Sequence, residues 1–215
     1  MSKKLIIFPF GGNGWEALDV VMAINRIKRT WNLIGFIDDD PKTWGKELCG
    51  IKVLGGREIL RKALDAFVLA VVGNANNYLK RREIIDGLKI HKSRLATIIH
   101  PSASISNAAK IGYNTLLMAH TVVSCETQIG NHCIVLPNTI VSHNSTVMDY
   151  CCIGSNVSVS GYVTICENCY IGSGTSIRDH VTIGSKTLVG LGSNVISGID
   201  SDCVVVGNPA RKILL

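Results

Sequence analysis

Residues 153–176 read IGSNVS, VSGYVT, ICENCY and IGSGTS when they are divided into groups of six. Each group begins with Ile or Val, and its fifth residue is small or β-branched. An α-helix has a period of about 3.6 residues and a strand a period of about two, so neither produces a strict period of six. A short fixed repeat is typical of stacked coils, each of which buries the apolar face of its neighbour.

The period of six extends on both sides of this stretch, from Ile99 to Val195. The position four residues after each aliphatic residue is small or β-branched in every unit. The pattern matches the hexapeptide repeat of parallel β-helices, so that three hexapeptides of this chain form one triangular coil of 18 residues. We predict between five and six coils, stacked about 4.8 Å apart. The aliphatic side chains expected to point inward are Ile99, Ile105, Ile111, Leu117, Val123, Ile129, Val135, Val141, Val147, Ile153, Val159, Ile165, Ile171, Ile177, Ile183, Val189 and Val195.

The first 97 residues differ from the repeats in composition and charge. All three Trp and all four Phe lie before residue 68, whereas Tyr is the only aromatic residue after it. Residues 1–97 hold 17 Lys and Arg against 10 Asp and Glu, a net charge of +7. Residues 98–215 hold 5 against 6, a net charge of −1. We therefore predict two domains, 1–97 and 98–215.

The first domain shows strands and helices in alternation. The predicted strands are 5–8, 33–37 and 67–72, with a short extended piece at 53–54, and the predicted helices are 17–27, 56–63 and 77–88. This β-α-β-α-β order predicts an α/β domain with a small parallel sheet and flanking helices, resembling one half of a Rossmann fold.

A glycine-rich loop follows the first predicted strand. Its residues fit the pattern G-x-G-x-x-A, and an acidic pair follows the second strand, roughly where dinucleotide folds place a ribose-binding acid. Backbone N–H groups at a helix N-terminus also hold phosphates. A nucleotide-activated sugar, a nicotinamide cofactor and a structural turn all fit, and the lack of a second mononucleotide half favours the sugar. The predicted substrate-binding residues are Gly11, Gly12, Asn13, Gly14, Asp38, Asp39, Gly73 and Asn74.

The basic residues of this domain come in short groups such as Arg61–Lys62 and Arg81–Arg82. Such groups indicate either a solvated helix face or attraction of an anionic ligand such as a phosphate. A long basic stripe, typical of proteins that bind nucleic acid, is missing. We therefore expect no nucleic-acid partner.

Several motifs occur in the order seen in one known family. They are the glycine loop, IDDDP at 37–41, VGN at 72–74, the hexapeptides and VGNPAR at 206–211. The chain resembles the acetyltransferases that include sialic acid O-acetyltransferases and N-acetyltransferases of nucleotide-linked 4-amino-4,6-dideoxy sugars. The loop departs from the family pattern, which often has His in place of Asn13 and a Gly-Ala type pair in place of Pro9-Phe10. The resemblance implies a left-handed β-helix, acetyl-CoA as donor and a homotrimer with active sites between neighbouring prisms.

The family resemblance places the catalytic histidine at His143. A His with an ordinary pKa of about 6.5 suits a general base at neutral pH. Gly161, one coil above, is the expected backbone donor for the acetyl carbonyl, and the expected acetyl-CoA contacts are Cys152, Ser173 and Leu191. Family members have a carboxylate beside this histidine where the chain has Asn144, so Glu126, one coil below Asn144, is a candidate substitute; a solvated corner residue is the alternative.

The sequence also excludes other classes. It has no CxxC pair and no two His five residues apart, the spacing with which γ-class carbonic anhydrases bind zinc on a β-helix, so we expect no metal. Cys133, Cys151 and Cys169 occupy the small interior position and are typical of buried, reduced thiols in a cytoplasmic protein. The apolar run that ends at Pro9 is too short for a signal peptide, and no segment is long enough to insert in a membrane.

The sequence thus predicts a cytoplasmic enzyme that moves acetyl from acetyl-CoA to the 4-amino group of a nucleotide-linked dideoxy sugar. O-acetylation of a sialic acid-like sugar is the alternative within the same chemistry. A β-helix binding protein without activity is the alternative of another class.

Overall fold

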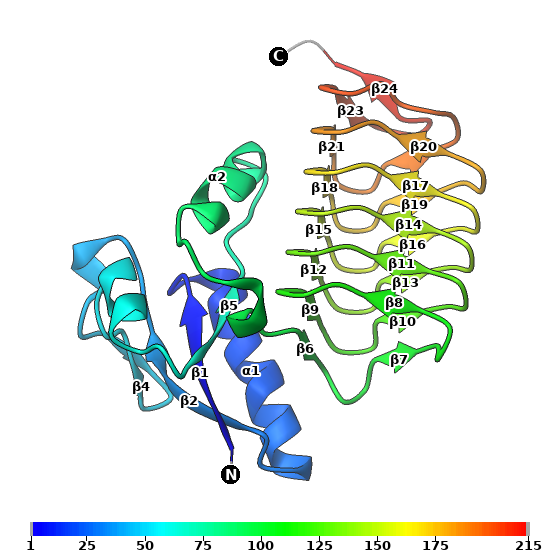
Figure 1. The fold of residues 1–215 in the computed structure, drawn as a ribbon. Helices are drawn as coiled ribbons and strands as arrows, with labels where there is room; N and C mark the ends of the chain where they lie inside the picture. The colour runs from blue at the N-terminus through cyan, green and yellow to red at the C-terminus, as the bar shows by residue number, and fades with distance from the viewer. Residues whose placement is uncertain (1, 214–215) are drawn as a thin grey trace.

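A computed structural model describes residues 2–213 and has a small α/β unit beside a column of stacked coils (Figure 1). The unit is built on a parallel sheet in the order β2-β1-β5. Its strands are β1 (Lys3–Phe8), β2 (Trp31–Phe36) and β5 (Phe67–Ala70). Helix α1 (Gly12–Ile27) packs its apolar side chains on this sheet, as the alternation of strand and helix predicts.

The other elements of the unit are short. They are η1 (Pro41–Thr43), the antiparallel pair β3 (Glu47–Leu48) and β4 (Ile51–Lys52), η2 (Arg57–Arg61), η3 (Tyr78–Lys80), α2 (Arg81–Asp86) and η4 (Lys92–Arg94). The helices predicted over 56–63 and 77–88 are therefore wrong in extent. The first is a 3₁₀ segment that ends at Arg61, and the carbonyls of Ala63 and Ala66 after it accept hydrogen bonds from the Arg94 guanidinium.

The column consists of three sheets whose strands are parallel, except that β24 pairs with β23 in the antiparallel direction. The β7 sheet contains β7 (Ser104–Ile105), β10 (Val122–Val123), β13 (Ile140–Val141), β16 (Ser158–Val159), β19 (Ser176–Ile177) and β22 (Asn194–Val195). The β8 sheet contains β8 (Lys110–Ile111), β11 (Gln128–Ile129), β14 (Thr146–Val147), β17 (Thr164–Ile165) and β20 (Thr182–Ile183). The β6 sheet contains β6 (Ile98–Ile99), β9 (Leu116–Leu117), β12 (Ile134–Val135), β15 (Cys152–Ile153), β18 (Tyr170–Ile171), β21 (Leu188–Val189), β23 (Val204–Val206) and β24 (Arg211–Lys212).

From β6 to β22, paired residues of adjacent coils are 18 positions apart, as Val122 and Ile140 are. In the last coil the offset falls to 16, as between Leu188 and Val204. The repeat therefore fixes the register, and a parallel β-helix of five to six coils is confirmed. The predicted interior residues form one core, in which Ile129 is 2% exposed and Ile171 is 0% exposed. Burial of each such side chain contributes about 1.5–3 kcal/mol.

The interior cysteines are confirmed as buried free thiols. Each donates its S–H to a carbonyl of the next coil, as Cys133 does to Met148 at 3.2 Å. Burial raises the pKa of the Cys133 thiol to about 12, so the group is uncharged at neutral pH. These thiols therefore act as small apolar side chains at a corner of the coils.

Three corners connect the sheets. We name the corner between the β8 and β6 sheets the docking corner (112–115, 130–133, 148–151 and 166–169), because the α/β unit contacts it. The His143 corner (124–127, 142–145, 160–163 and 178–181) joins the β7 and β8 sheets. The third corner (136–139, 154–157, 172–175 and 190–193) joins the β6 and β7 sheets.

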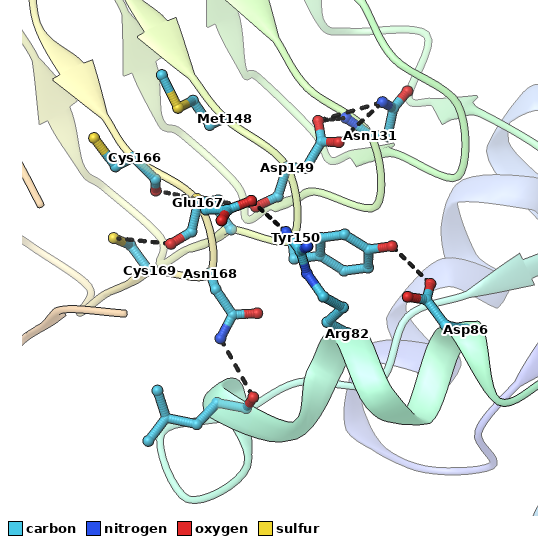
Figure 2. Close-up of polar contacts among 12 residues, drawn as sticks. Arg82, Asp86, Asn131, Met148, Asp149, Tyr150, Cys166, Glu167, Asn168 and Cys169 are labelled. Carbon is cyan, nitrogen blue, oxygen red and sulfur yellow. Dashed lines mark hydrogen bonds and ion pairs between the residues drawn. The ribbon is translucent and has the colours of Figure 1, made fainter. Parts of the chain in front are cut away.

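The α/β unit packs on the β6 sheet and on the docking corner. The side-chain amide of Asn114 pairs with both backbone groups of Ala70, donating to its oxygen at 2.9 Å and accepting from its nitrogen at 2.7 Å. Further along the corner, Arg82 forms an ion pair with Glu167, and the hydroxyl of Tyr150 donates to Asp86 at 2.7 Å (Figure 2). Polar contacts at successive coils thus fix the unit along the column.

Candidate functional site

His143 lies exposed at the second position of its corner, beside Asn144. Its Nδ1 atom is 3.0 Å from Oδ1 of Asn144. An amide oxygen can only accept a hydrogen bond, so Nδ1 carries the ring proton in this arrangement. The second nitrogen, Nε2, then has a free lone pair and can accept a proton from a substrate.

Gly161 lies against the imidazole from the coil above. A Cβ atom at this position would lie 2.7 Å from Cε1 of His143 and 2.9 Å from Nε2, so any side chain would displace the ring. Among the described residues, none accepts a hydrogen bond from the Gly161 N–H. The structure therefore places Gly161 against the imidazole of His143, as the 18-residue spacing predicts.

Two further residues of this corner were not recognised in the sequence. The ring of Tyr162 packs edge-on against His143 with the centroids 5.3 Å apart, and it stacks on His180 at 4.8 Å. Both occupy the position of Asn144 in the following coils, at intervals of 18 residues, so the repeat itself predicts that they lie near His143. The Tyr162 ring limits the orientations open to His143.

Glu126 lies one coil below Asn144 in the same left-handed backbone conformation, with φ values of 55° and 57°. The N–H of Asn144 donates to the Cys125 carbonyl at 3.1 Å, which confirms that these two corners stack. The Glu126 side chain is exposed and makes no hydrogen bond to any described residue, His143 included. The structure thus stacks Glu126 as expected but pairs the histidine with Asn144.

A second cluster forms where the α/β unit meets the β6 sheet. A cavity of about 120 Å³ is lined by Asn13, Gly73, Asn74 and Cys152, together with Ile134, Leu136, Ile153, Gly154 and Tyr170. It joins three residues of the predicted substrate-binding set with one predicted acetyl-CoA contact. Burial raises the pKa of the Cys152 thiol, so this wall of the cavity is uncharged at neutral pH.

Some predicted substrate-binding side chains are occupied by contacts within the chain. Both oxygens of Asp38 accept from backbone N–H groups, of Phe10 at 2.9 Å and of Asp40 at 2.8 Å. Asp39 forms an ion pair with Arg57. Both carboxylates therefore already have partners within the chain, and their roles in substrate binding remain predictions.

The glycines of the loop have different surroundings. A Cβ atom on Gly14 would lie 2.1 Å from the Pro9 carbonyl oxygen, so helix α1 can approach the first strand only with glycine there. No atom lies within 4 Å of a Cβ atom built on Gly11 or Gly12. These two positions are open at the N-terminus of a helix, where backbone N–H groups attract anions.

The other predicted acetyl-CoA contacts lie on the third corner. The hydroxyl of Ser173 accepts from the Ser155 N–H at 3.0 Å, one coil below. Leu191, one coil above Ser173, is 74% exposed. An exposed leucine on this corner is suited to contact an apolar part of a ligand.

The two clusters lie on different sides of one prism. The cavity and the third corner border the β6 sheet, whereas His143 is on the corner opposite that sheet. In Figure 1 the α/β unit lies beside the strands of the β6 sheet and away from the opposite edge of the column. A single chain therefore does not bring His143 to the predicted substrate loop.

Arg81 corrects the interpretation of the basic groups. The sequence favours a solvated helix face for Arg81–Arg82, and Arg82 is exposed. Arg81 is 0% exposed, because its guanidinium fills the space between α2 and the docking corner. The sequence pattern is the same for these two adjacent arginines, and only the tertiary packing determines that one is buried and the other exposed.

Neither a metal centre nor a membrane span is found in the part of the chain that is described. Residues 2–213 contain no group of three His, Cys, Asp or Glu side chains that could hold a metal ion. No helix in the same range is long and apolar enough to cross a membrane.

Comparison with known proteins identifies the family. The family model described as "GMPPB C-terminal domain" matches residues 94–205, which is more than half of the chain. The chain belongs to this family. The matched residues include the coils and the His143 corner.

Individual relatives carry acetyltransferase names. UDP-N-acetylbacillosamine N-acetyltransferase of Bacillus subtilis (strain 168) is 31% identical over 119 residues, which are 54% of this chain and 52% of the relative. The match thus spans about half the length of that relative. The acetyltransferase domain of PglB from Neisseria gonorrhoeae, solved with acetyl coenzyme A, is 28% identical, with a TM-score of 0.88 over 99% of this chain and 100% of that one.

A further solved structure shows the same fold. PerB from Caulobacter crescentus, in complex with CoA and GDP-perosamine, is 22% identical, with a TM-score of 0.83 over 100% of this chain and 98% of that one. The resemblance to sugar acetyltransferases that the sequence motifs indicate is confirmed by these relatives.

Proposed function

We propose that the chain is an acetyltransferase that moves acetyl from acetyl-CoA to the 4-amino group of a nucleotide-linked 4-amino-4,6-dideoxy sugar. The name of the Bacillus relative and the acetyl coenzyme A bound to the Neisseria domain support this reaction. The observation that carries it is the arrangement at the His143 corner, where Nε2 of His143 is free and lies against Gly161.

The chemistry follows from these two groups. The sugar amine attacks the thioester carbonyl, and His143 Nε2 takes the proton that the amine loses. The carbonyl oxygen becomes an oxyanion, which the Gly161 N–H stabilises by donating a hydrogen bond. When the C–S bond breaks, the electron pair leaves with the CoA sulfur, which can take the proton from His143. Acetyl passes directly to the amine, without a covalent enzyme intermediate.

The active assembly in this proposal is a homotrimer. His143 and the cavity at Asn13, Gly73 and Cys152 lie on different sides of one prism. A site that uses both needs the His143 corner of one chain beside the β6 sheet of another. Cys152, Ser173 and Leu191 would then hold acetyl-CoA next to the neighbouring histidine.

The α/β unit supplies the site for the nucleotide in this proposal. Gly11 and Gly12 leave backbone N–H groups open at the start of α1, which suits a diphosphate. Asn74 and Gly73 line the cavity on the side toward the acetyl donor. We place the enzyme in the cytoplasm, where acetyl-CoA is available and its cysteines stay reduced.

A CoA-release assay tests the reaction. The purified chain is incubated with acetyl-CoA and a panel of UDP-, GDP- and dTDP-linked 4-amino sugars, with free sialic acids in parallel, and the acetylated product is identified by mass spectrometry. We expect N-acetylation of one nucleotide-linked amino sugar. Acetylation of sialic acid hydroxyls alone would make the chain an O-acetyltransferase. Failure to bind acetyl-CoA in a titration would make it a β-helix protein without this activity.

A further inference from the structure

Arg81 is a buried arginine with no carboxylate partner among the described residues. Its guanidinium is 0% exposed and donates to three backbone carbonyls. Nε donates to Tyr150 at 3.0 Å, and the two terminal nitrogens donate to His132 and Val72. His132 and Tyr150 occupy the same corner position in consecutive coils. The planar fork of the guanidinium thus spans one coil spacing and joins the column to the chain after β5.

The segment that Arg81 contacts is fixed from two sides. The side-chain amide of Asn13 donates to the carbonyls of Val71 at 3.1 Å and Gly73 at 2.7 Å. Arg81 holds the carbonyl between them, that of Val72. Three consecutive carbonyls therefore have side-chain donors, alternately from helix α1 and from Arg81. This pattern restrains the orientation of all three peptide planes.

The restrained segment forms a wall of the cavity at the β6 sheet. A Cβ atom on Gly73 would lie 2.2 Å from Nη1 of Arg81 and 2.7 Å from Sγ of Cys152, so the glycine is confined between these two side chains. Gly73, Asn74 and Cys152 all line the cavity. A movement of the guanidinium would therefore shift the Gly73 side of the wall. Cys152 would stay in place, because its own N–H bonds to Cys169 in the next coil at 2.9 Å.

We propose that Arg81 is a positioning residue for the acceptor: it holds the Val72–Gly73–Asn74 turn at the height over Cys152 that the nucleotide-linked sugar requires. This inference rests on the proposed function. Arg81 does not touch the reacting atoms, so it sets the affinity for the acceptor and leaves the chemical step to His143. The sequence places Arg81 seven residues after Asn74, outside every motif.

The test compares Arg81→Met with Arg81→Lys in steady-state kinetics on the acceptor found for the wild type. A displaced binding group costs up to about 100-fold per ångström. We expect KM for the sugar nucleotide to rise at least about tenfold in Arg81→Met and by less in Arg81→Lys, which keeps one donor. We expect kcat and KM for acetyl-CoA to stay within about threefold in both.

Two control variants separate positioning from docking. Arg82→Met removes the neighbouring arginine, which also contacts the column through Glu167 but is remote from Val72. Asn114→Ser removes the buried docking bonds to Ala70. Neither should raise the acceptor KM by more than about twofold. If Asn114→Ser raises it as much as Arg81→Met, the effect belongs to docking in general, and the proposal is wrong.

Gly73→Ala provides an independent route if Arg81→Met does not fold. The added methyl group clashes with Arg81 and Cys152, and Gly73 has a φ of 157°, which alanine rarely adopts. Both effects displace the same turn, so the same selective rise in acceptor KM is expected. If Arg81→Met folds and its acceptor KM is unchanged, the proposal is wrong. If it does not fold, an unchanged acceptor KM in both Arg81→Lys and Gly73→Ala has the same meaning. Neither result contradicts the proposed function. A wild type that transfers no acetyl group and binds neither UDP, GDP nor dTDP in calorimetry overturns both.

Discussion

The Nδ1 atom of His143 lies 3.0 Å from the Oδ1 atom of Asn144, and this contact selects the tautomer of the imidazole. A carboxylate in place of Asn144 would select the same tautomer and would also stabilise the imidazolium. The amide does only the first. In the proposed reaction, Asn144 therefore orients the imidazole of His143 without placing a negative charge beside it.

Replacement of His143 by Ala tests the base. We expect kcat to fall by roughly 10²–10⁴-fold, the usual contribution of a general base, with the affinity for acetyl-CoA little changed. Steady-state kinetics and a calorimetric titration of acetyl-CoA measure the two quantities. Activity that survives within a few-fold would show that another group accepts the proton.

Replacement of Asn144 by Asp tests the missing charge. A carboxylate beside Nδ1 favours the charged imidazole and so raises the pKa of His143. In the proposed reaction, the neutral imidazole of His143 accepts the proton, and this form is lost at low pH. The acidic limb of the kcat/KM–pH profile should therefore move to higher pH in the Asp variant, by about one unit at this exposed position. Asn144→Ser is the control that removes the amide without adding charge. A limb that stays in place in the Asp variant would mean that the profile does not report His143.

Replacement of Glu126 by Gln tests the carboxylate one coil below. Glu126 makes no hydrogen bond to His143, so any effect acts through space, across the coil spacing of about 4.8 Å. Loss of the negative charge destabilises the imidazolium, so the acidic limb should move to lower pH, by a few tenths of a unit and more at low salt. The profile is measured at two ionic strengths. An identical profile for the variant would remove Glu126 from the site and leave it as a solvated corner residue.

The column could be predicted from the sequence because the repeat of the sequence directly sets the number of residues in one coil. Each coil repeats after 18 residues, so a position such as Ile171 is interior because Ile153 and Val189 are. The same arithmetic placed Gly161 over His143. The local rule is strong enough that no distant part of the chain alters it.

The α/β unit and its contacts could be predicted only in outline. The segment 77–88 is helical in pattern, but the structure divides it into η3 and α2 and buries Arg81 at the start of α2. Asn13 matches a ligand-binding motif, yet its amide holds the carbonyls of Val71 and Gly73. The partners of Asn13 are 58 and 60 residues away in sequence, and two of the partners of Arg81 are 51 and 69 residues away, so no periodicity encodes these contacts. The separation of His143 from the substrate loop is likewise a property of the assembled prism.

His132 gives the fold a dependence on pH. Burial lowers the pKa of this imidazole from 6.5 to about 4. As the pH falls from 6.5 to about 4, the unfolded chain binds a proton at His132 before the folded chain does, so stability is lost over this window, by about 3 kcal/mol in all. Urea unfolding at pH 7 and pH 4.5 should show this loss in the wild type and a smaller loss in His132→Phe, which keeps a flat ring to stack on Tyr150. An equal loss in both proteins would assign the pH dependence to other groups.

Replacement of Gly161 by Ala tests the contact between Gly161 and the imidazole in the His143 corner. The new methyl group would lie 2.7 Å from Cε1 of His143, so the ring must rotate away from Asn144 and from the free N–H of residue 161. Gly161 does not have a positive φ, so Ala fits the backbone and the fold should stay intact. We expect kcat/KM to fall about 10²-fold, the scale of a misplacement of about one ångström, with an unchanged melting temperature. Serine at 161 should behave like alanine, because the clash involves Cβ. Full activity in the alanine variant would mean that Nε2 of His143, which lies on the side of the ring that faces residue 161, is not the proton acceptor.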